Sequence, residues 1–551
     1  MNKRKVFMPI MIVMMSITLI ACGGSDESSA TSSDDGTTKH PQETAGTVTL
    51  TESWSFPSGI VPALNPGVAT NYEGVYWGKN FYDTLVSYDD QRRIVGQLAE
   101  SWEMSDDGKR YTFHLRDGVR FSDGTPLTAE AVKLSFEAAV FNLGMFNGSY
   151  GRLSSLFETI EIIDDLTVAI NLTQPYYGTL NDLTMSCPLA IVNPVAFEGA
   201  DDLRYSDVFK TASFGTGPYM YQGEYSNNTY TFVRNPHYWG EPPHADKFEV
   251  KIIADNDTKL LALRNGEIDM IAGTSRINFD GFAQMSAVPG FGSAMDSRSS
   301  LNRFLGMNLT KAPFNDERVR KAVAYAIDQQ ALEKAVFNGL ETATETLFPA
   351  TATYCDVDQT VFGTDLEQAG RLMAAAGWVD TDGDGIREKD TVKLVVDMNY
   401  LKSLASIDNL ALALASQLKK IGFKVNVIPG DMMTYYAAMA TSHLVLANTY
   451  GGAFDPNAVL TNMNPSFSTD PLLIQVSGFF SEGLLDELEA TSDENRVKEI
   501  YEVILKTIAD KTLLVPLTRS HDLAIWNDTV VDGYVFDADP SYVLVQNIRM
   551  K

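Results

Sequence analysis

The composition of the 551-residue chain excludes several classes of protein before any motif is considered. A net charge of −28 argues against binding to nucleic acid, because the phosphate backbone carries charge of the same sign. Three Cys residues are too few for a disulfide scaffold or a four-thiolate zinc site. The length is several times the ~100–200 residues of one domain, so two or three folded domains are expected.

The N-terminus has the pattern of a bacterial export signal. Basic residues at positions 3–5 precede an uncharged run over 6–21, which predicts a signal peptide over 1–21. The run ends in Leu-Ile-Ala-Cys, which resembles the bacterial lipobox, where the cysteine thiol takes a diacylglyceryl group. We therefore expect Cys22 to carry a lipid that anchors an exported protein at the outer face of the cell membrane or in the periplasm.

The stretch that follows Cys22 differs in composition from the rest of the chain. Residues 22–47 are rich in Ser, Thr, Asp and Gly and nearly lack apolar side chains, so they predict a disordered tether. No further run of ~18 apolar residues follows, and the remainder is expected to be water-soluble.

Hydrophobic patterning predicts a mixed α/β fold beyond the tether. Residues 111–115 and 166–172 alternate between apolar and polar side chains, which is typical of half-buried strands. Thr128 precedes an apolar run with an acidic residue in its first turn and predicts the start of a helix.

The clearest unit of secondary structure lies in the second half of the chain. An apolar strand at 392–398, a helix at 406–421 ended by Gly422 and a strand at 424–428 predict a βαβ crossover with parallel pairing. Further elements are expected at 442–448 (strand), 492–510 (helix) and 513–518 (strand).

Eight sequence blocks resemble a known protein family. They are 97–102 (QLAESW), 106–108 (DDG), 111–116 (YTFHLR), 121–130 (FSDGTPLTAE), 215–219 (GTGPY), 234–240 (RNPHYWG), 266–269 (GEID) and 308–322. Together they are similar to the signature of family 5 extracellular solute-binding proteins, the peptide/nickel receptors of bacterial ABC importers. The resemblance covers nearly all of residues 50–550.

The resemblance implies an α/β fold like that of the periplasmic binding proteins (type II, three-lobed), with two large lobes around a ligand cleft and a smaller inserted lobe. The expected boundaries are 48–90, 215–299 and 523–551 for lobe I, 91–214 for the inserted lobe II, and 300–522 for lobe III. It also implies a monomer that closes over a solute and docks on ABC permease and ATPase subunits. The signature blocks themselves are expected to be structural.

The resemblance also indicates which kind of solute the cleft would bind. Peptide receptors of the family carry an Asp that pairs with the peptide ammonium, and here Ala453 stands at that position. A buried ammonium without a carboxylate partner is costly, so a nickel or other metal chelate is favoured, with a di- or oligopeptide as the alternative. The nickel-receptor branch has an Arg and sometimes a His in the cleft, whereas this chain has Cys187 and the stretch 466–468 (SFS) there.

Aromatic side chains then become the main candidates for solute contact, because such walls suit a flat or amphipathic solute. The expected ligand-binding residues are Tyr72, Tyr76, Trp77, Cys187, Tyr450 and Phe454. The competing interpretation is that the five aromatic residues simply fill the core, and that Cys187 is simply a small buried side chain. Arg152 is a further candidate for contact with a carboxylate.

A second motif concerns a cation. Asp380, Asp382 and Asp384 occupy positions one, three and five of a calcium-loop pattern, but position twelve is Thr391 and not the usual Glu. The pattern predicts at most a structural calcium ion, and an Asx-rich turn is the competing interpretation. No other cofactor is expected.

Catalytic motifs are missing from the sequence. It contains neither GxSxG nor HExxH, and its six His show no pair at ligand spacing. A secreted hydrolase is therefore a distant alternative, and we expect no enzymatic activity. A chemosensory or adhesive role for the same fold stays open.

Overall fold

The computed structural model describes residues 46–53, 56, 77–144, 147–148, 151–205, 207–273, 276–404, 406–449, 456–539 and 542–551. The predicted signal peptide and tether, and with them Cys22, lie outside these residues. From Ala45 to Lys551 the chain forms one compact unit. Among the described residues, none of the helices combines the length and the hydrophobicity needed to cross a bilayer.

The first sheet combines the first strand of the chain with three strands that lie much later in the sequence. Its order is β1 (Thr47–Glu52), β10 (Lys247–Ile252), β9 (Thr229–Arg234) and β8 (Tyr219–Ser226). β1 pairs with β10 in parallel, and the other pairs are antiparallel. Its core is aromatic, with the Phe232 and Phe248 rings stacked 4.6 Å apart.

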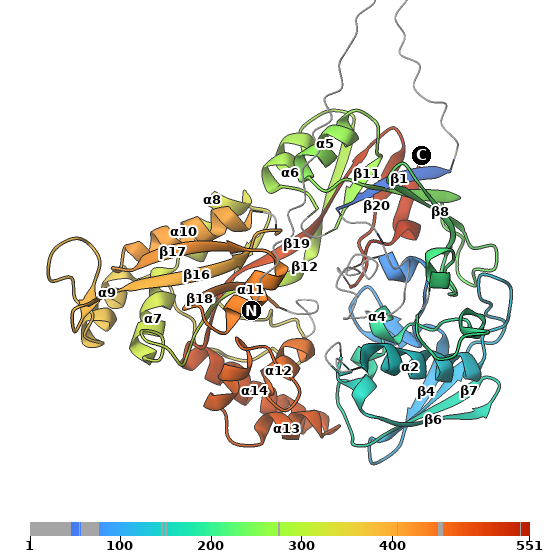
Figure 1. Cartoon of the computed structure of the whole chain (residues 1–551), viewed down its shortest axis with the longest axis horizontal. Helices are drawn as coiled ribbons and strands as arrows, with labels where there is room; N and C mark the ends of the chain where they lie inside the picture. The colour runs from blue at the N-terminus through green and yellow to red at the C-terminus, as the bar shows by residue number, and fades with distance from the viewer. Residues whose placement is uncertain are drawn as a thin grey trace, which may run out of the picture. The chain divides into compact units, whose positions relative to one another are not determined.

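The second sheet is antiparallel and lies beside helix α2, Ala129–Leu143 (Figure 1). Its order is β4 (Ala99–Met104), β5 (Arg110–Leu115), β7 (Thr167–Leu172) and β6 (Phe157–Asp164). Tyr111, Phe113 and Leu115 of β5 are buried while the alternate residues are half-buried, which confirms the strand predicted at 111–115. Helix α2 begins after Thr128 as predicted and packs on β6 and β7.

The third and largest sheet has seven strands and contains both parallel and antiparallel pairs. Its order is β11 (Met270–Ala272), β19 (Leu514–Asn527), β12 (Phe291–Met307), β18 (Leu444–Asn448), β16 (Val395–Leu401) and β17 (Lys424–Gly430), with β13 (Thr342–Ala343) on β19. β16 and β17 are parallel and are joined by α10 (Ile407–Lys419), which confirms the predicted βαβ crossover. Gly422 has φ +90°, a conformation that favours glycine and ends the helical segment.

The remaining elements are short sheets and helices. The two-stranded sheets are β2 (Val86–Tyr88) with β3 (Ile94–Gly96), β14 (Glu388–Lys389) with β15 (Val392–Lys393), and β20 (Val531–Tyr534) with β21 (Ile548–Met550). The helices are α3 (Thr179–Asp182), α4 (Ser186–Leu189), α5 (Asn256–Arg264), α6 (Phe279–Ser286), α7 (Glu317–Ala326), α8 (Gln329–Phe337), α9 (Leu366–Ala375), α11 (Met432–Met439), α12 (Asn457–Met463), α13 (Leu484–Glu489) and α14 (Glu494–Asp510).

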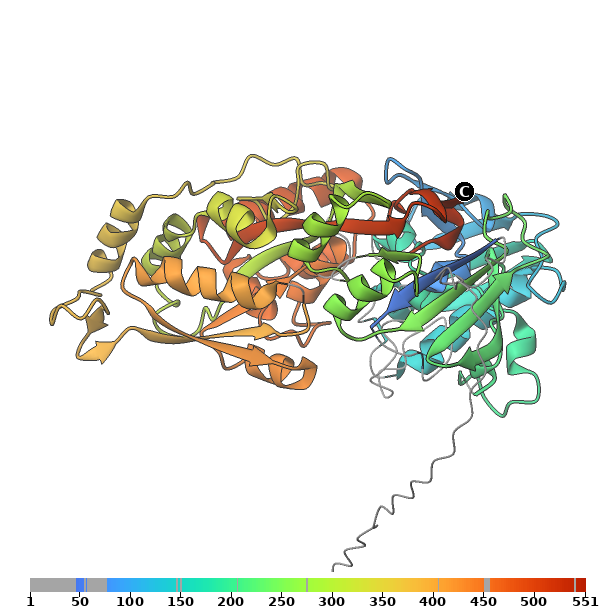
Figure 2. The ribbon, with the colours of Figure 1, turned by 90° about the horizontal axis from the view of Figure 1, so that it is seen from above.

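The ladder between β12 and β19 connects two hydrophobic cores. Ala524 and Trp526 of β19 belong to the core of the first sheet, whereas Leu514 and Val515 belong to that of the third sheet. Figure 2 shows β19 as the long red strand that runs through both regions. The predicted lobe boundaries at 299/300 and 522/523 fall inside these two strands, and the division into lobes stays a prediction.

Residues of three signature blocks meet at the buried carboxylate of Asp83. Its Oδ2 accepts hydrogen bonds from Thr216 Oγ1 (2.8 Å) and Trp239 Nε1 (2.9 Å), and its Oδ1 accepts from Gln97 Nε2 (2.6 Å). A Cβ at Gly215 would lie 2.0 Å from the carbonyl oxygen of Phe81, so only glycine permits this approach. The structural interpretation of these blocks is thereby confirmed for these residues.

Candidate functional site

Most of the aromatic side chains expected in the cleft fall outside the described residues. Tyr72, Tyr76, Tyr450 and Phe454 are among them, so their contact with a solute stays a prediction. Trp77 and Cys187 are described, and so are the chain segments that follow the other four positions.

Trp77 lies in the core of the first sheet. Its side chain is 1% exposed, and its ring stacks on Phe248 at a centroid distance of 6.1 Å. Its Nε1 donates to Glu52 Oε2 (3.1 Å), an oxygen that also pairs with Arg276 (2.6 Å). These contacts give Trp77 a core position, and solute contact by Trp77 stays a prediction.

Cys187 lies on α4 and is 6% exposed. The neighbouring Ser186 donates to the Tyr542 hydroxyl (3.0 Å), and the Lys79 ammonium lies 4.2 Å from the Tyr542 ring centroid. Lys79 also forms an ion pair with Asp537 (3.3 Å). Cys187 therefore lies beside a polar cluster that joins three distant chain segments, while a role as a ligand stays a prediction.

A second polar network joins the residues around 176 to the chain that follows Tyr450 and Phe454. Asn457 Nδ2 donates to the Tyr176 hydroxyl (2.7 Å) and to Asp182 Oδ1 (3.3 Å), and its Oδ1 accepts from Tyr177 (2.6 Å). The Tyr177 hydroxyl also lies 3.1 Å from that of Tyr501. Both ends of the Asn457 amide are thus used, which fixes the start of α12 directly after the predicted aromatic wall.

Two positions that the sequence comparison singled out separately are brought together beside this network. The Arg152 guanidinium carbon lies 3.7 Å from the ring centroid of Phe467, the residue within the stretch where the nickel branch has a His. Burial lowers the pKa of Arg152, and the carboxylate of Glu489 opposes this shift. The site therefore contains a cation stacked on an aromatic ring, a contact that favours a desolvated guanidinium.

Glu489 is a buried acid that sequence reasoning missed. Its side chain is 1% exposed, Oε1 accepts from Thr461 (2.8 Å), and Oε2 has no hydrogen-bond partner. Burial raises the pKa of Glu489 from 4.5 to about 7, although Thr461 and Arg152 lower it in part. Nothing in the local sequence, a short acidic helix, distinguishes this Glu from its exposed neighbours.

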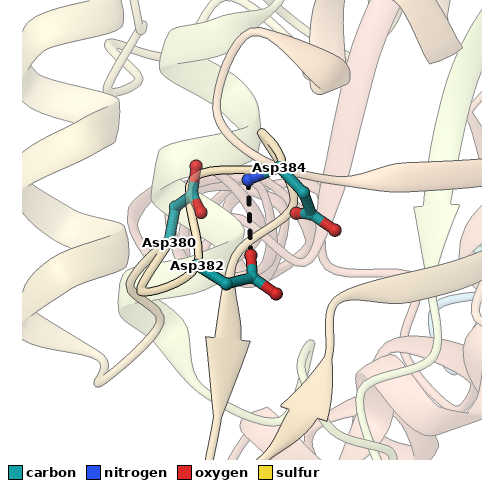
Figure 3. Close-up of side chains that lie close together, drawn as sticks. All are labelled: Asp380, Asp382 and Asp384. Atoms are coloured by element: carbon teal, nitrogen blue, oxygen red, sulfur yellow. Dashed lines mark hydrogen bonds between the residues drawn. The ribbon is translucent and has the colours of Figure 1, made fainter.

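The predicted calcium loop is formed by exposed residues between α9 and β14 (Figure 3). The carboxylates of Asp380, Asp382 and Asp384 offer oxygens that lie within 4.8 Å of one another. Asp382 Oδ1 accepts from the Asp384 backbone N–H (3.3 Å), as in an Asx turn. The Lys393 ammonium pairs with Asp382 (2.6 Å) and Asp384 (2.8 Å), so an internal cation already balances part of the charge. Calcium binding stays a prediction.

Comparison with models of protein families shows to which family the chain belongs. Residues 93–470 match the model for the middle region of bacterial extracellular solute-binding proteins, family 5. The chain belongs to this family. It is therefore a solute-binding protein of an ABC importer and not an enzyme, and it acts with permease and ATPase subunits.

Individual members of family 5 resemble the chain over most of its length. The nickel-binding periplasmic protein of Escherichia coli is 29% identical over 85% of this chain and 88% of its own length. A probable D,D-dipeptide-binding periplasmic protein of the same organism is 28% identical over 81% of this chain and 82% of its own length. The crystal structure of NikA from Brucella suis with Fe(III)-EDTA superposes with a TM-score of 0.82 at 26% identity, covering 92% of this chain and all of that one. These comparisons confirm the predicted family and the α/β binding-protein fold.

Proposed function

We propose that this protein is a lipid-anchored receptor that captures a small metal chelate, a nickel complex being favoured, and delivers it to a membrane permease. The observation that carries the proposal is the similarity to the nickel-binding protein of E. coli, which extends over 85% of the chain. The likeness to NikA with Fe(III)-EDTA supports a chelate in place of a bare ion. Ala453, at the position where peptide receptors have an Asp, points the same way.

A peptide solute is the second candidate. The similarity to a probable D,D-dipeptide-binding protein favours it. Metal chelates of organic acids and peptides share one chemical property, because both carry carboxylate groups.

A thermal-unfolding screen tests the proposal. The exported protein carrying Cys22→Ser would be mixed with nickel alone, nickel with L-histidine, L-histidine alone, D-alanyl-D-alanine and pools of di- to pentapeptides. A bound solute stabilises the native state by ~2.7 kcal/mol at a hundredfold excess over its dissociation constant. A rise in midpoint with nickel–histidine alone supports the chelate, and a rise with peptides alone supports the alternative. No response to any probe would overturn both.

The anchor is tested separately. Wild-type protein is expected to partition into a detergent phase and to carry a diacylglyceryl group on Cys22, whereas Cys22→Ser stays in the aqueous phase. An unmodified Cys22 in the mature wild-type protein, seen by mass spectrometry, would contradict this part of the proposal.

A further inference from the structure

Asn302 and Arg519 face each other across the ladder that connects the two cores. Asn302 of β12 is the direct antiparallel partner of Arg519 of β19. Side chains directly opposite in such a ladder lie on the same face, with Cβ atoms ~5 Å apart. The next pair, Arg303 and Thr518, projects to the other face, where both side chains bind Glu341.

Several polar atoms of this pair are buried without a hydrogen-bond partner. Asn302 is 1% exposed, and neither its Oδ1 nor its Nδ2 has a partner. The Nε of Arg519 is likewise buried and unpaired. The Arg519 side chain is held through Nη2, which donates to Thr346 Oγ1 (2.7 Å) and to its backbone carbonyl (3.1 Å). Unpaired buried polar atoms are rare in folded proteins because each costs free energy, so adjacent ones indicate a missing partner.

The charge at this place is also uncompensated. Burial lowers the pKa of Arg519 to about 10, and among the described residues only the thiol of Cys355 opposes that shift. Two buried arginines are each paired with a carboxylate, Arg276 with Glu52 and Arg303 with Glu341. The buried Arg320 instead donates to the backbone carbonyls of Phe314, Lys511 and Thr512, whereas the Nε of Arg519 has neither kind of partner. A desolvated guanidinium with no carboxylate among the described residues is electrostatically suited to an anion supplied from outside the chain.

We propose that Asn302 and Arg519 form a site for a carboxylate of the solute. The Arg519 Nε–H and the Asn302 amide N–H donate to the carboxylate oxygens, and Asn302 Oδ1 accepts from an N–H or O–H group of the same solute. The inference rests on the proposed receptor function and narrows its solute class to anions that carry a carboxylate beside a hydrogen-bond donor.

The test compares solutes with and without a carboxylate on the exported Cys22→Ser protein. The probes are nickel(II) with L-histidine, nickel(II) with histamine, D-alanyl-D-alanine and alaninamide, each followed by calorimetry and thermal unfolding. Wild-type protein is expected to bind the carboxylate-bearing member of at least one of the two pairs about tenfold or more tightly than its partner. Binding only of histamine or alaninamide forms would overturn the carboxylate site and leave the receptor function standing. No binding of any probe would overturn both.

Two substitutions locate the site. Arg519→Met should lower the affinity for the carboxylate-bearing probe about 10- to 100-fold, because the substitution removes a charge-assisted hydrogen bond together with the positive charge. Asn302→Asp places an internal carboxylate opposite Arg519, so it should raise the unfolding midpoint of the unliganded protein and remove probe binding. Lys420→Met, which removes one exposed charge at the end of α10, should bind as wild type does. Wild-type affinity in both Arg519→Met and Asn302→Asp would overturn the proposal, whereas a purely structural Arg519 predicts a lower midpoint without this selectivity.

Discussion

The two faces of the β12–β19 ladder differ in how an arginine side chain is paired. On one face Arg303 is 1% exposed, its Nε donates to both oxygens of Glu341 and its Nη2 lies 2.8 Å from Glu341 Oε1; the second oxygen of Glu341 also accepts from Thr518. On the other face Arg519 lies opposite an Asn302 amide with no partner on either atom. An ion pair that is complete within the protein has no hydrogen-bonding group left to bind a solute, so we interpret the first face as structural. The second face has unpaired groups and is the receptive face, the one that can bind a solute. The difference teaches that unmet hydrogen-bonding capacity, and not charge alone, marks a candidate for binding.

The largest expected effect comes from breaking the complete pair. Glu341→Gln leaves the Arg303 guanidinium buried without its counter-charge and should lower the free energy of unfolding by about 3–5 kcal/mol. Arg519→Met is the matched variant on the other face and should cost only about 1–2 kcal/mol, because the two hydrogen bonds from Nη2 to Thr346 are lost but no buried carboxylate is left unpaired. Urea unfolding measures both, and equal losses for the two variants would erase the distinction between the faces.

The second prediction concerns Glu489, another buried group with an unpaired atom. Its folded-state pKa of about 7 exceeds its ordinary value of 4.5, so the native state holds the proton more tightly than the unfolded chain does. The free energy of unfolding is therefore expected to fall by up to about 3 kcal/mol as the pH rises from 4.5 to 7, and to stay low above that range.

Glu489→Gln removes this dependence. The variant should be more stable than wild type at pH 8 and should match it near pH 4.5, as followed by thermal unfolding across that range. Parallel pH profiles for the two proteins would show that Glu489 is ionised at neutral pH in the native state.

The third prediction compares two buried amides. Asn457→Leu removes hydrogen bonds to Tyr176, Tyr177 and Asp182 and should cost about 1–3 kcal/mol of stability, because these groups are left unpaired. Asn302→Leu should cost less than about 0.5 kcal/mol or stabilise the unliganded protein, since its amide has no partner to lose. A loss at Asn302 as large as that at Asn457 would contradict the receptive character of the second face.

The smallest effect is expected at the exposed acidic loop. Lys393 pairs with Asp382 and Asp384, and these carboxylates hold the pKa of Lys393 above its ordinary value. Lys393→Gln should therefore raise the affinity of the loop for calcium by about two- to fivefold over wild type. Calorimetric titration with calcium chloride measures this, with Lys420→Met as the control for net charge. Equal titrations of Lys393→Gln and wild type would show that the lysine does not compete with the ion.

Local patterns predicted much of the fold and little of the candidate site. The helix expected at 406–421 is found at Ile407–Lys419, because its apolar spacing is a property of neighbouring residues. The strand expected at 392–398 is divided into β15 and β16, since Lys393 turns toward the acidic loop and β14. The strand expected at 513–518 continues to Asn527, because its second half pairs with β11 and with the first half of β12.

By itself the sequence determined the family, the α/β class, the parallel crossover and the acidic loop. All of these depend on residue types at short, fixed spacing, where side-chain periodicity and turn chemistry act locally. The tertiary structure alone decided which polar groups are satisfied. Glu341, which directly precedes β13, pairs with Arg303 and Thr518 although both lie far from it in the sequence. Asn302 and Arg519 meet only through the register of β12 and β19. Whether a buried charge is paired depends on the desolvation and the neighbours that folding creates, and no local pattern records them.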